Sequence, residues 1–171
     1  MRISLCNEVV GDFDFAAQCA LARKFGYDGI EIAPFTLSDD PSRLTGAQRK
    51  DLRSTAADHG LAITSLHYLL RAPSGLSITS ADDAQRSRAI DVMRGLCGLA
   101  ADLGAKILVH GSPDQRKLVN DADDDGRKRG ADCFAAVAQA ATSSGVTYCI
   151  EPLSRDQTAF VNTIEEAADI V

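Results

Sequence analysis

The chain has 171 residues, of which 45% are hydrophobic and 25% charged, a composition typical of a globular protein with one core. Its 24 acidic and 18 basic residues give a formal net charge of −6, which argues against nucleic acid as a partner because binding a phosphate backbone needs a basic surface. Five scattered cysteines and no secretory signal predict reduced thiols in the cytoplasm, and no apolar stretch approaches the ~20 residues that span a bilayer.

Short apolar runs alternate with longer amphipathic segments along the chain. The runs cover residues 2–6, 29–33, 61–70, 106–112 and 146–153, and the segments cover residues 13–26, 46–60, 82–104, 126–145 and 163–171. The runs have the length of strands and are nearly continuous in hydrophobicity, which is typical of parallel strands buried on both faces. We therefore predict five consecutive βα units in a single domain over residues 1–171.

Local signals mark the ends of the predicted helices. Glycines that supply a left-handed residue close the first four helices, at Gly26, Gly60, Gly104 and Gly145. Thr45 with Gln48, and Thr163 with Glu166, have the spacing of a capping box at a helix start.

Two architectures are built from βα units, an open doubly wound sheet and the (β/α)8 TIM barrel. Five units complete an open sheet, whereas a barrel needs three more units and about 250 residues. The chain stops at Val171 inside an amphipathic segment without a closing glycine, which favours the first five units of a barrel.

Polar residues interrupt four of the five apolar runs: Glu31, His67, His110 and Glu151. The carboxyl ends of parallel strands gather at one face, so these side chains are expected to converge there. Carboxylates and imidazoles around one cavity suit a divalent metal ion. The alternatives are a solvent-facing carboxylate for Glu31 and hydrogen-bonded histidines without a ligand role; Glu151 is the hardest to explain this way, because a buried carboxylate is rare unless paired or metal-bound.

Two other features have simpler explanations. The sequence "DADDDG" at residues 121–126 matches the start of a calcium loop, but Lys128 and Arg129 fall inside that loop, so we interpret the aspartates as the amino end of a helix. Cys6 and Cys149 are interpreted as small core residues rather than nucleophiles.

Three stretches, "GYDGIEIAP", "LVHGSP" and above all "IEPLSRDQTAFVNTIEEAADIV", resemble the xylose isomerase-like barrel superfamily. Its members include ketose 3-epimerases, hydroxypyruvate isomerase, inosose dehydratase and endonuclease IV. The resemblance runs over all 171 residues but over only five of the eight units.

The resemblance implies that Glu151 binds a divalent ion (manganese, cobalt, magnesium or zinc) and acts as a catalytic acid/base group, with the remaining ligands on strands six to eight. It implies isomerisation or epimerisation of a small sugar or related hydroxy-carbonyl substrate by proton transfer through an enediolate. We expect His67, His110, Gln157 and Glu31 to line the substrate pocket. Many relatives have asparagine in place of Ser154 and glutamate in place of Gln157, and a glutamine cannot act as a base.

Two alternatives remain open at this point. In endonuclease IV, histidines at the ends of strands three and four join the strand-five glutamate around zinc ions, and His67 and His110 stand at comparable places. The other alternative is a non-catalytic open-sheet binding module. A barrel of five units would leave the edges of strands one and five unpaired, which favours association, including with a second copy of the chain.

Overall fold

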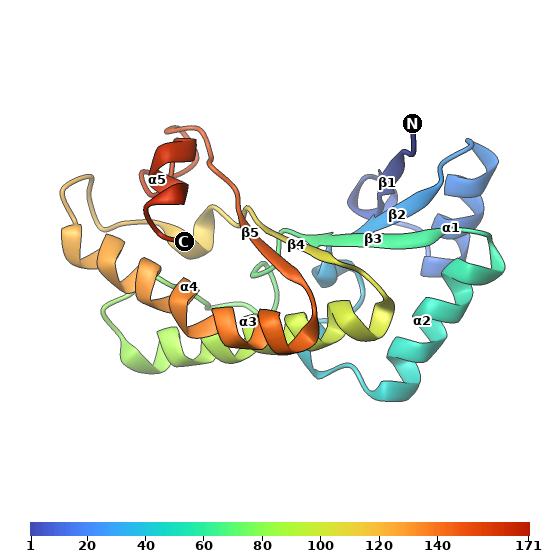
Figure 1. Cartoon of the computed structure of the whole chain (residues 1–171), viewed down its shortest axis with the longest axis horizontal. Helices are drawn as coiled ribbons and strands as arrows, with labels where there is room; N and C mark the ends of the chain where they lie inside the picture. The colour runs from blue at the N-terminus through green and yellow to red at the C-terminus, as the bar shows by residue number, and fades with distance from the viewer.

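Five parallel strands lie side by side in chain order, β1-β2-β3-β4-β5, in the computed structural model, which describes all residues from Met1 to Val171 (Figure 1). The strands are β1 (Ser4–Cys6), β2 (Gly29–Ile32), β3 (Ala62–His67), β4 (Ile107–His110) and β5 (Thr147–Ile150). The α-helices are α1 (Phe15–Lys24), α2 (Gly46–Asp58), α3 (Asp83–Leu103), α4 (Asp124–Ser144) and α5 (Ile164–Ala168). Short 3-10 helices follow in the loops: η1 (Asn7–Val10), η2 (Pro34–Thr36), η3 (Pro41–Arg43) and η4 (Asp114–Arg116).

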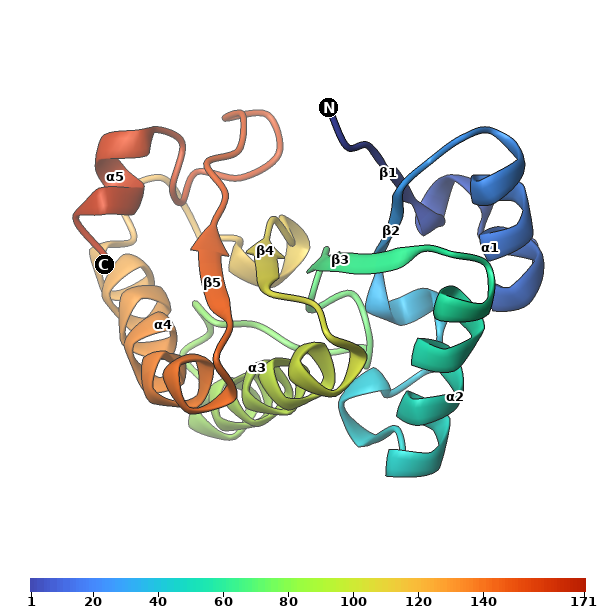
Figure 2. The same ribbon diagram turned by 45° about the vertical axis from the view of Figure 1, so that its right-hand side comes forward.

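The order of the strands decides between the two predicted architectures. A doubly wound sheet reverses its strand order at a switch point, so that some neighbouring strands are not consecutive in the chain. Here every neighbour is consecutive and parallel, and helices α1 to α4 follow one another around the outside of a curved sheet (Figure 2). The prediction of a partial TIM barrel of five βα units is confirmed, and the open-sheet alternative does not fit this topology.

The helix ends confirm most of the predicted signals. Thr45 and Gln48 form a reciprocal capping box at the start of α2. At α5, Thr163 accepts from the amide of Glu166, but the Glu166 carboxylate accepts from the amide of Asn162 rather than that of Thr163. The four predicted glycines all have a positive φ.

The aspartates at residues 121–125 start a helix, as the sequence predicts. The side chain of Asp123 caps α4 by accepting from the amide of Gly126 at 2.8 Å. Hydrogen bonds from backbone amides to this carboxylate, chiefly that of Gly126, lower the pKa of Asp123.

A β-bulge in β3 sets which side chains face the core. Ile30 pairs with Ile63 but Glu31 pairs with Ser65, so Thr64 is an extra residue without a partner in β2. Because side chains alternate along a strand, this extra residue lets both Ile63 and Leu66 point towards the helices. It also leaves Ser65 and His67 on the opposite face, together with Glu31.

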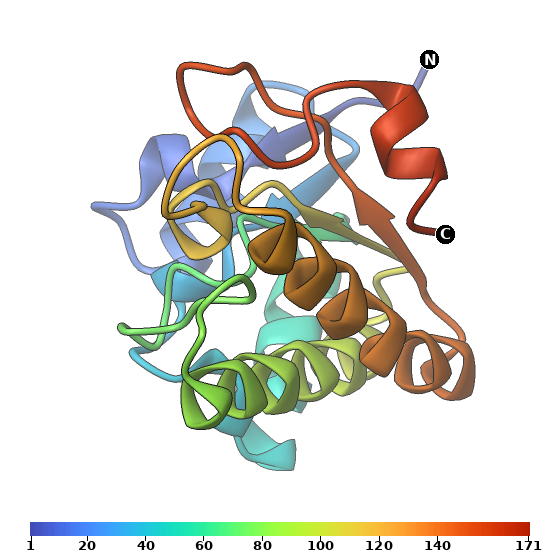
Figure 3. The same cartoon turned by 90° about the vertical axis from the view of Figure 1, so that its left-hand side faces the viewer.

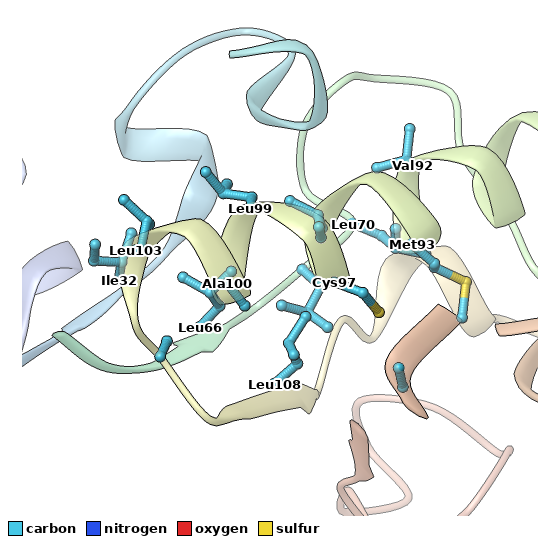
Figure 4. Packing of buried hydrophobic residues seen from close by; sticks show 14 of the residues in the cluster. Ile32, Leu66, Leu70, Val92, Met93, Cys97, Leu99, Ala100, Leu103 and Leu108 are labelled. Atoms are coloured by element: carbon cyan, nitrogen blue, oxygen red, sulfur yellow. The ribbon is translucent and has the colours of Figure 1, made fainter. Parts of the chain in front are cut away.

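The core lies between the sheet and α3. Ile32, Leu66 and Leu108 from the strands share one hydrophobic cluster with α3, which contributes Val92, Met93, Cys97, Leu99, Ala100 and Leu103 (Figure 4). Helix α4 runs alongside α3 on the same side of the sheet (Figures 1 and 3). None of the helices combines the length and apolar character needed to cross a bilayer.

Truncating a side chain at the centre of this core should be costly. We expect Leu66→Ala to lower the free energy of unfolding by about 2–5 kcal/mol, since it removes buried contacts and leaves a cavity under α3. Val119→Ala, which changes a side chain at an exposed loop position, is the control and should shift it by less than about 0.5 kcal/mol. Urea unfolding of the three proteins measures both effects, and equal midpoints would contradict the assignment of this core.

Candidate active site

A cavity of about 430 Å³ opens at the carboxyl ends of the strands. Its lining residues are Glu8 after β1, His67 and Tyr68 at the end of β3, Gly111 and Pro113 after β4, and Glu151, Leu153 and Gln157 after β5. Ligands bind at this face in barrels of this topology. The structure therefore brings together three of the residues singled out from the sequence, His67, Glu151 and Gln157.

Glu151 stands just beyond the last residue of β5, with its side chain exposed in the cavity. No hydrogen bond or ion pair from a protein group reaches its carboxylate, so both oxygens are free to bind a cation or to exchange a proton. The expectation that this carboxylate is buried is wrong, because β5 ends at Ile150 and the chain then enters an open loop. A Cβ atom at Gly111 would collide with Oε2 of Glu151, so the glycine leaves room for the carboxylate.

A buried arginine fixes the backbone at Glu151. Arg116, the last residue of η4, is fully buried, and its Nη2 donates to the carbonyl oxygen of Glu151 at 2.7 Å. Burial lowers the pKa of Arg116 to about 10, and the nearby charge of Glu151 opposes that shift. The carbonyl of Arg116 accepts from the hydroxyl of Thr158, which ties η4 to the loop after β5.

His67 lies beside the thiol of Cys6 at the end of β1 and the carboxylates of Glu8 in η1 and Glu31 in β2. Its Nε2 is 3.5 Å from Sγ of Cys6 and 3.3 Å from Oε2 of Glu8, and its Nδ1 is 3.6 Å from Oε2 of Glu31. The hydroxyl of Ser65 donates to the other oxygen of Glu31 at 2.7 Å. Glu31 does not line the cavity, but it contacts His67, which does.

Two of these neighbours were not recognised as functional candidates in the sequence. Cys6 is half-buried and lies outside the hydrophobic core, so its interpretation as a core residue is wrong, and Cys149 lies outside that core as well. Burial raises the pKa of the Cys6 thiol. The position of Cys6 at the end of the first predicted strand could have marked it as a site residue; in the structure it is the last residue of β1 and pairs with Glu31. Glu8 comes from η1, a turn that the hydrophobic pattern does not reveal.

The loop after β3 contributes an aromatic wall. Tyr68 lines the cavity and has a φ of +53°, a left-handed conformation that is uncommon for a bulky residue. Its ring packs edge-to-face on Phe35, and the guanidinium of Arg71 lies 4.7 Å from the centre of the Phe35 ring. No sequence pattern identified Tyr68 as a cavity residue.

The structure does not bring His110 to the cavity. It is fully buried, with Nδ1 hydrogen-bonded to the hydroxyl of Tyr148 at 2.8 Å and its ring against Phe134 of α4. Burial is the main cause that lowers the pKa of His110 to about 3, and the charge of Arg116 adds to it. His110 follows Val109, the partner of His67, so alternation directs it to the helix-covered face.

Comparison with known proteins is consistent with this geometry. The family model described as a xylose isomerase-like TIM barrel matches residues 19–171. The chain belongs to the xylose isomerase-like TIM barrel family. Within the family, it is 29% identical over 157 residues to SgbU of Escherichia coli K12, which carries the name of an L-ribulose-5-phosphate 3-epimerase; the match covers 91% of this chain and 52% of SgbU.

Other proteins give similar matches. UlaE of Escherichia coli SMS-3-5, named L-ribulose-5-phosphate 3-epimerase, is 27% identical over 77% of this chain and 45% of its own length. The chain thus spans about half the length of the curated relatives it matches. The crystal structure of a D-psicose 3-epimerase with D-fructose superposes with a TM-score of 0.80 at 20% identity, over 99% of this chain and 58% of that one. The zinc-bound structure of the protein IolI gives a TM-score of 0.73 at 20% identity, over 100% and 58%.

The buried histidine of this family member should make its stability sensitive to acid. Below about pH 6.5 the unfolded chain protonates His110, whereas the folded protein keeps it neutral down to about pH 3, so folding stability should fall as the pH drops through this range. For this group we expect a loss of about 2 kcal/mol between pH 7.5 and pH 5. His110→Gln should remove that part of the pH dependence in urea unfolding curves, and an unchanged dependence would contradict the assignment.

Proposed function

We propose that the protein is a sugar epimerase or isomerase that needs a divalent metal ion, manganese, cobalt, magnesium or zinc, and acts on a ketose or a related small hydroxy-carbonyl compound. The observation that carries the proposal is the free carboxylate of Glu151, exposed with Gln157 and His67 in one cavity at the carboxyl ends of parallel strands. The relatives support the substrate class, since both curated ones carry the name of a sugar-phosphate 3-epimerase.

Glu151 suits the role of a metal ligand. Carboxylate oxygens are ligands of each of these metal ions, and no protein group competes for those of Glu151. When bound, the ion polarises the carbonyl and the neighbouring hydroxyl of the sugar, which acidifies the adjacent C–H bond. In this proposal the other ligands come from strands six to eight of the barrel, beyond the five present in this chain.

The residues of this chain supply proton transfer and hydrogen bonds to the substrate. The Glu151 carboxylate removes the acidified proton, which leaves an enediolate of the sugar. Gln157 and His67 can hydrogen-bond sugar hydroxyls, and the neutral amide of Gln157 can both donate and accept but cannot act as a base. Delivery of a proton to the same carbon from the opposite face, by a second acid that would come from strands six to eight, gives an epimer. Delivery of a proton to the neighbouring carbon gives an isomer.

The endonuclease alternative has less support. It needs the imidazoles of His67 and His110 beside Glu151 around zinc ions, but His110 is sealed between the sheet and α4. The net charge of −6 also disfavours a DNA backbone as a partner.

Removing the carboxylate of Glu151 should abolish turnover while the fold persists. We expect Glu151→Gln to lower kcat/KM by at least about 10²–10⁴-fold in the full-length enzyme, because the amide cannot accept the proton. The assay is conversion of a panel of ketoses and ketose phosphates in D₂O, where the proposal requires deuterium at the carbon beside the carbonyl. Normal turnover by a folded Glu151→Gln variant would contradict the assignment of Glu151 as the catalytic base.

Crowding the Glu151 carboxylate should have a similar but milder effect. In Gly111→Ala the new methyl group displaces this flexible side chain without disturbing the backbone, so we expect kcat to fall at an unchanged unfolding temperature. Gly46→Ala at the start of α2 is the matched control, because a methyl group there meets no neighbour, and it should retain full turnover. Equal activities of the two variants would contradict the proposed position of the carboxylate.

A further inference from the structure

A second group of potential metal ligands lies on the first three strands, apart from Glu151. Cys6 ends β1, Glu31 lies in β2 and His67 ends β3, and one ligand atom of each lies within 4.8 Å of the other two. Cys6 pairs directly with Glu31, and the bulge in β3 brings His67 to the same face. Paired strands hold this group more rigidly than a loop would.

The hydrogen bonds within the group are incomplete. His67 Nδ1 is buried and makes no hydrogen bond, since the nearest oxygen of Glu31 is 3.6 Å away. The contact between Sγ of Cys6 and His67 Nε2 is 3.5 Å, a weak interaction for a neutral thiol. Glu8 adds a second carboxylate 3.3 Å from the same nitrogen. One imidazole is thus surrounded by two carboxylates and a thiol, with no lysine or arginine paired to either carboxylate.

The donor set suits zinc. Thiolate sulfur, imidazole nitrogen and carboxylate oxygen are its ordinary ligands, and a tetrahedral site with bonds of about 2.0–2.3 Å separates its ligand atoms by about 3.3–3.8 Å. Small side-chain rotations would bring the observed group into that range. Ser65 supports such a site from behind, because its hydroxyl holds one oxygen of Glu31 and leaves the other directed at His67.

We propose that Cys6, Glu31 and His67 form a zinc site that is separate from the Glu151 site, with a fourth position left for a water molecule. The ion joins β1, β2 and β3 near their carboxyl ends and compensates the charge of Glu31. Because His67 also lines the cavity, this zinc site forms part of the cavity wall. The proposal concerns only these three side chains and does not depend on the reaction proposed above.

Cobalt(II) is the probe that separates this site from one built on carboxylates alone, because a thiolate ligand gives an intense charge-transfer band in the near ultraviolet. Titration of the metal-free, full-length protein with cobalt(II) chloride should produce this band with one thiolate-bound ion per chain, in addition to any ion bound at Glu151, and added zinc should abolish the band. Cys6→Ser should eliminate the band. The matched control is Cys149→Ser, at another half-buried strand cysteine, which should retain it.

Two further variants complete the test. Glu31→Gln, which preserves an acceptor for Ser65, should weaken cobalt binding by about tenfold or more. Glu151→Gln should keep the band even where it abolishes turnover, so failure of the zinc site and failure of the proposed function are distinguishable. Circular dichroism of each variant verifies the fold. A band that is absent, or that survives in folded Cys6→Ser, would overturn the proposal and leave His67 as a histidine placed between two carboxylates.

Discussion

The single extra residue in β3 is the constraint on which the rest of the site depends. In a regular strand Thr64 would pair with Glu31 and Ser65 with Ile32, and the Ser65 hydroxyl would point towards the helices. With the bulge, Ile63 and Leu66 both reach the core while Ser65 and His67 face the opposite side. The apolar face thereby stays continuous against α3, and the polar face collects Cys6, Glu31 and His67. One irregularity in the backbone therefore satisfies packing and chemistry together.

A second constraint acts at the other end of the sheet, where β5 turns into the loop that carries Glu151. A fully buried arginine is unusual. Arg116 positions the backbone at Glu151, because it donates to the carbonyl of Glu151 rather than to its carboxylate. Its guanidinium orders the backbone while the carboxylate stays free for a ligand. Had it paired with the carboxylate instead, the positive charge would compete with any cation for the same oxygens.

Much of the fold follows from local patterns in the sequence. Apolar runs of strand length, helix-closing glycines and the Thr45 capping box each depend on neighbours in the chain, and each occurs where the sequence predicts it. The convergence of His67 and Glu151 also follows, since the carboxyl ends of parallel strands share a face. These features need only the chain order of the elements. Gln157 was expected at that face only from the resemblance to the family.

The misjudged features depend on register instead. His110 and His67 both end strands, yet His67 pairs with Val109, so His110 is one position further along and points to the opposite face. An apolar run that ends in histidine contains no information about that one-residue difference. Cys6 is the reverse case, a residue type usual in cores that register places among polar groups.

The charges around the cavity connect the two sites. Glu8 and Glu151 both line it, and Glu31 lies behind His67, so three carboxylates lie at or next to its wall in a chain whose net charge is −6. The buried cation Arg116 donates a hydrogen bond to the backbone carbonyl of Glu151. Neighbouring carboxylates repel one another, and a divalent ion offsets that repulsion while it binds to them. The group around His67 belongs to β1, β2 and β3, whereas Glu151 follows β5, and β4 lies between them in the sheet, so the two proposed ions occupy separate places along it.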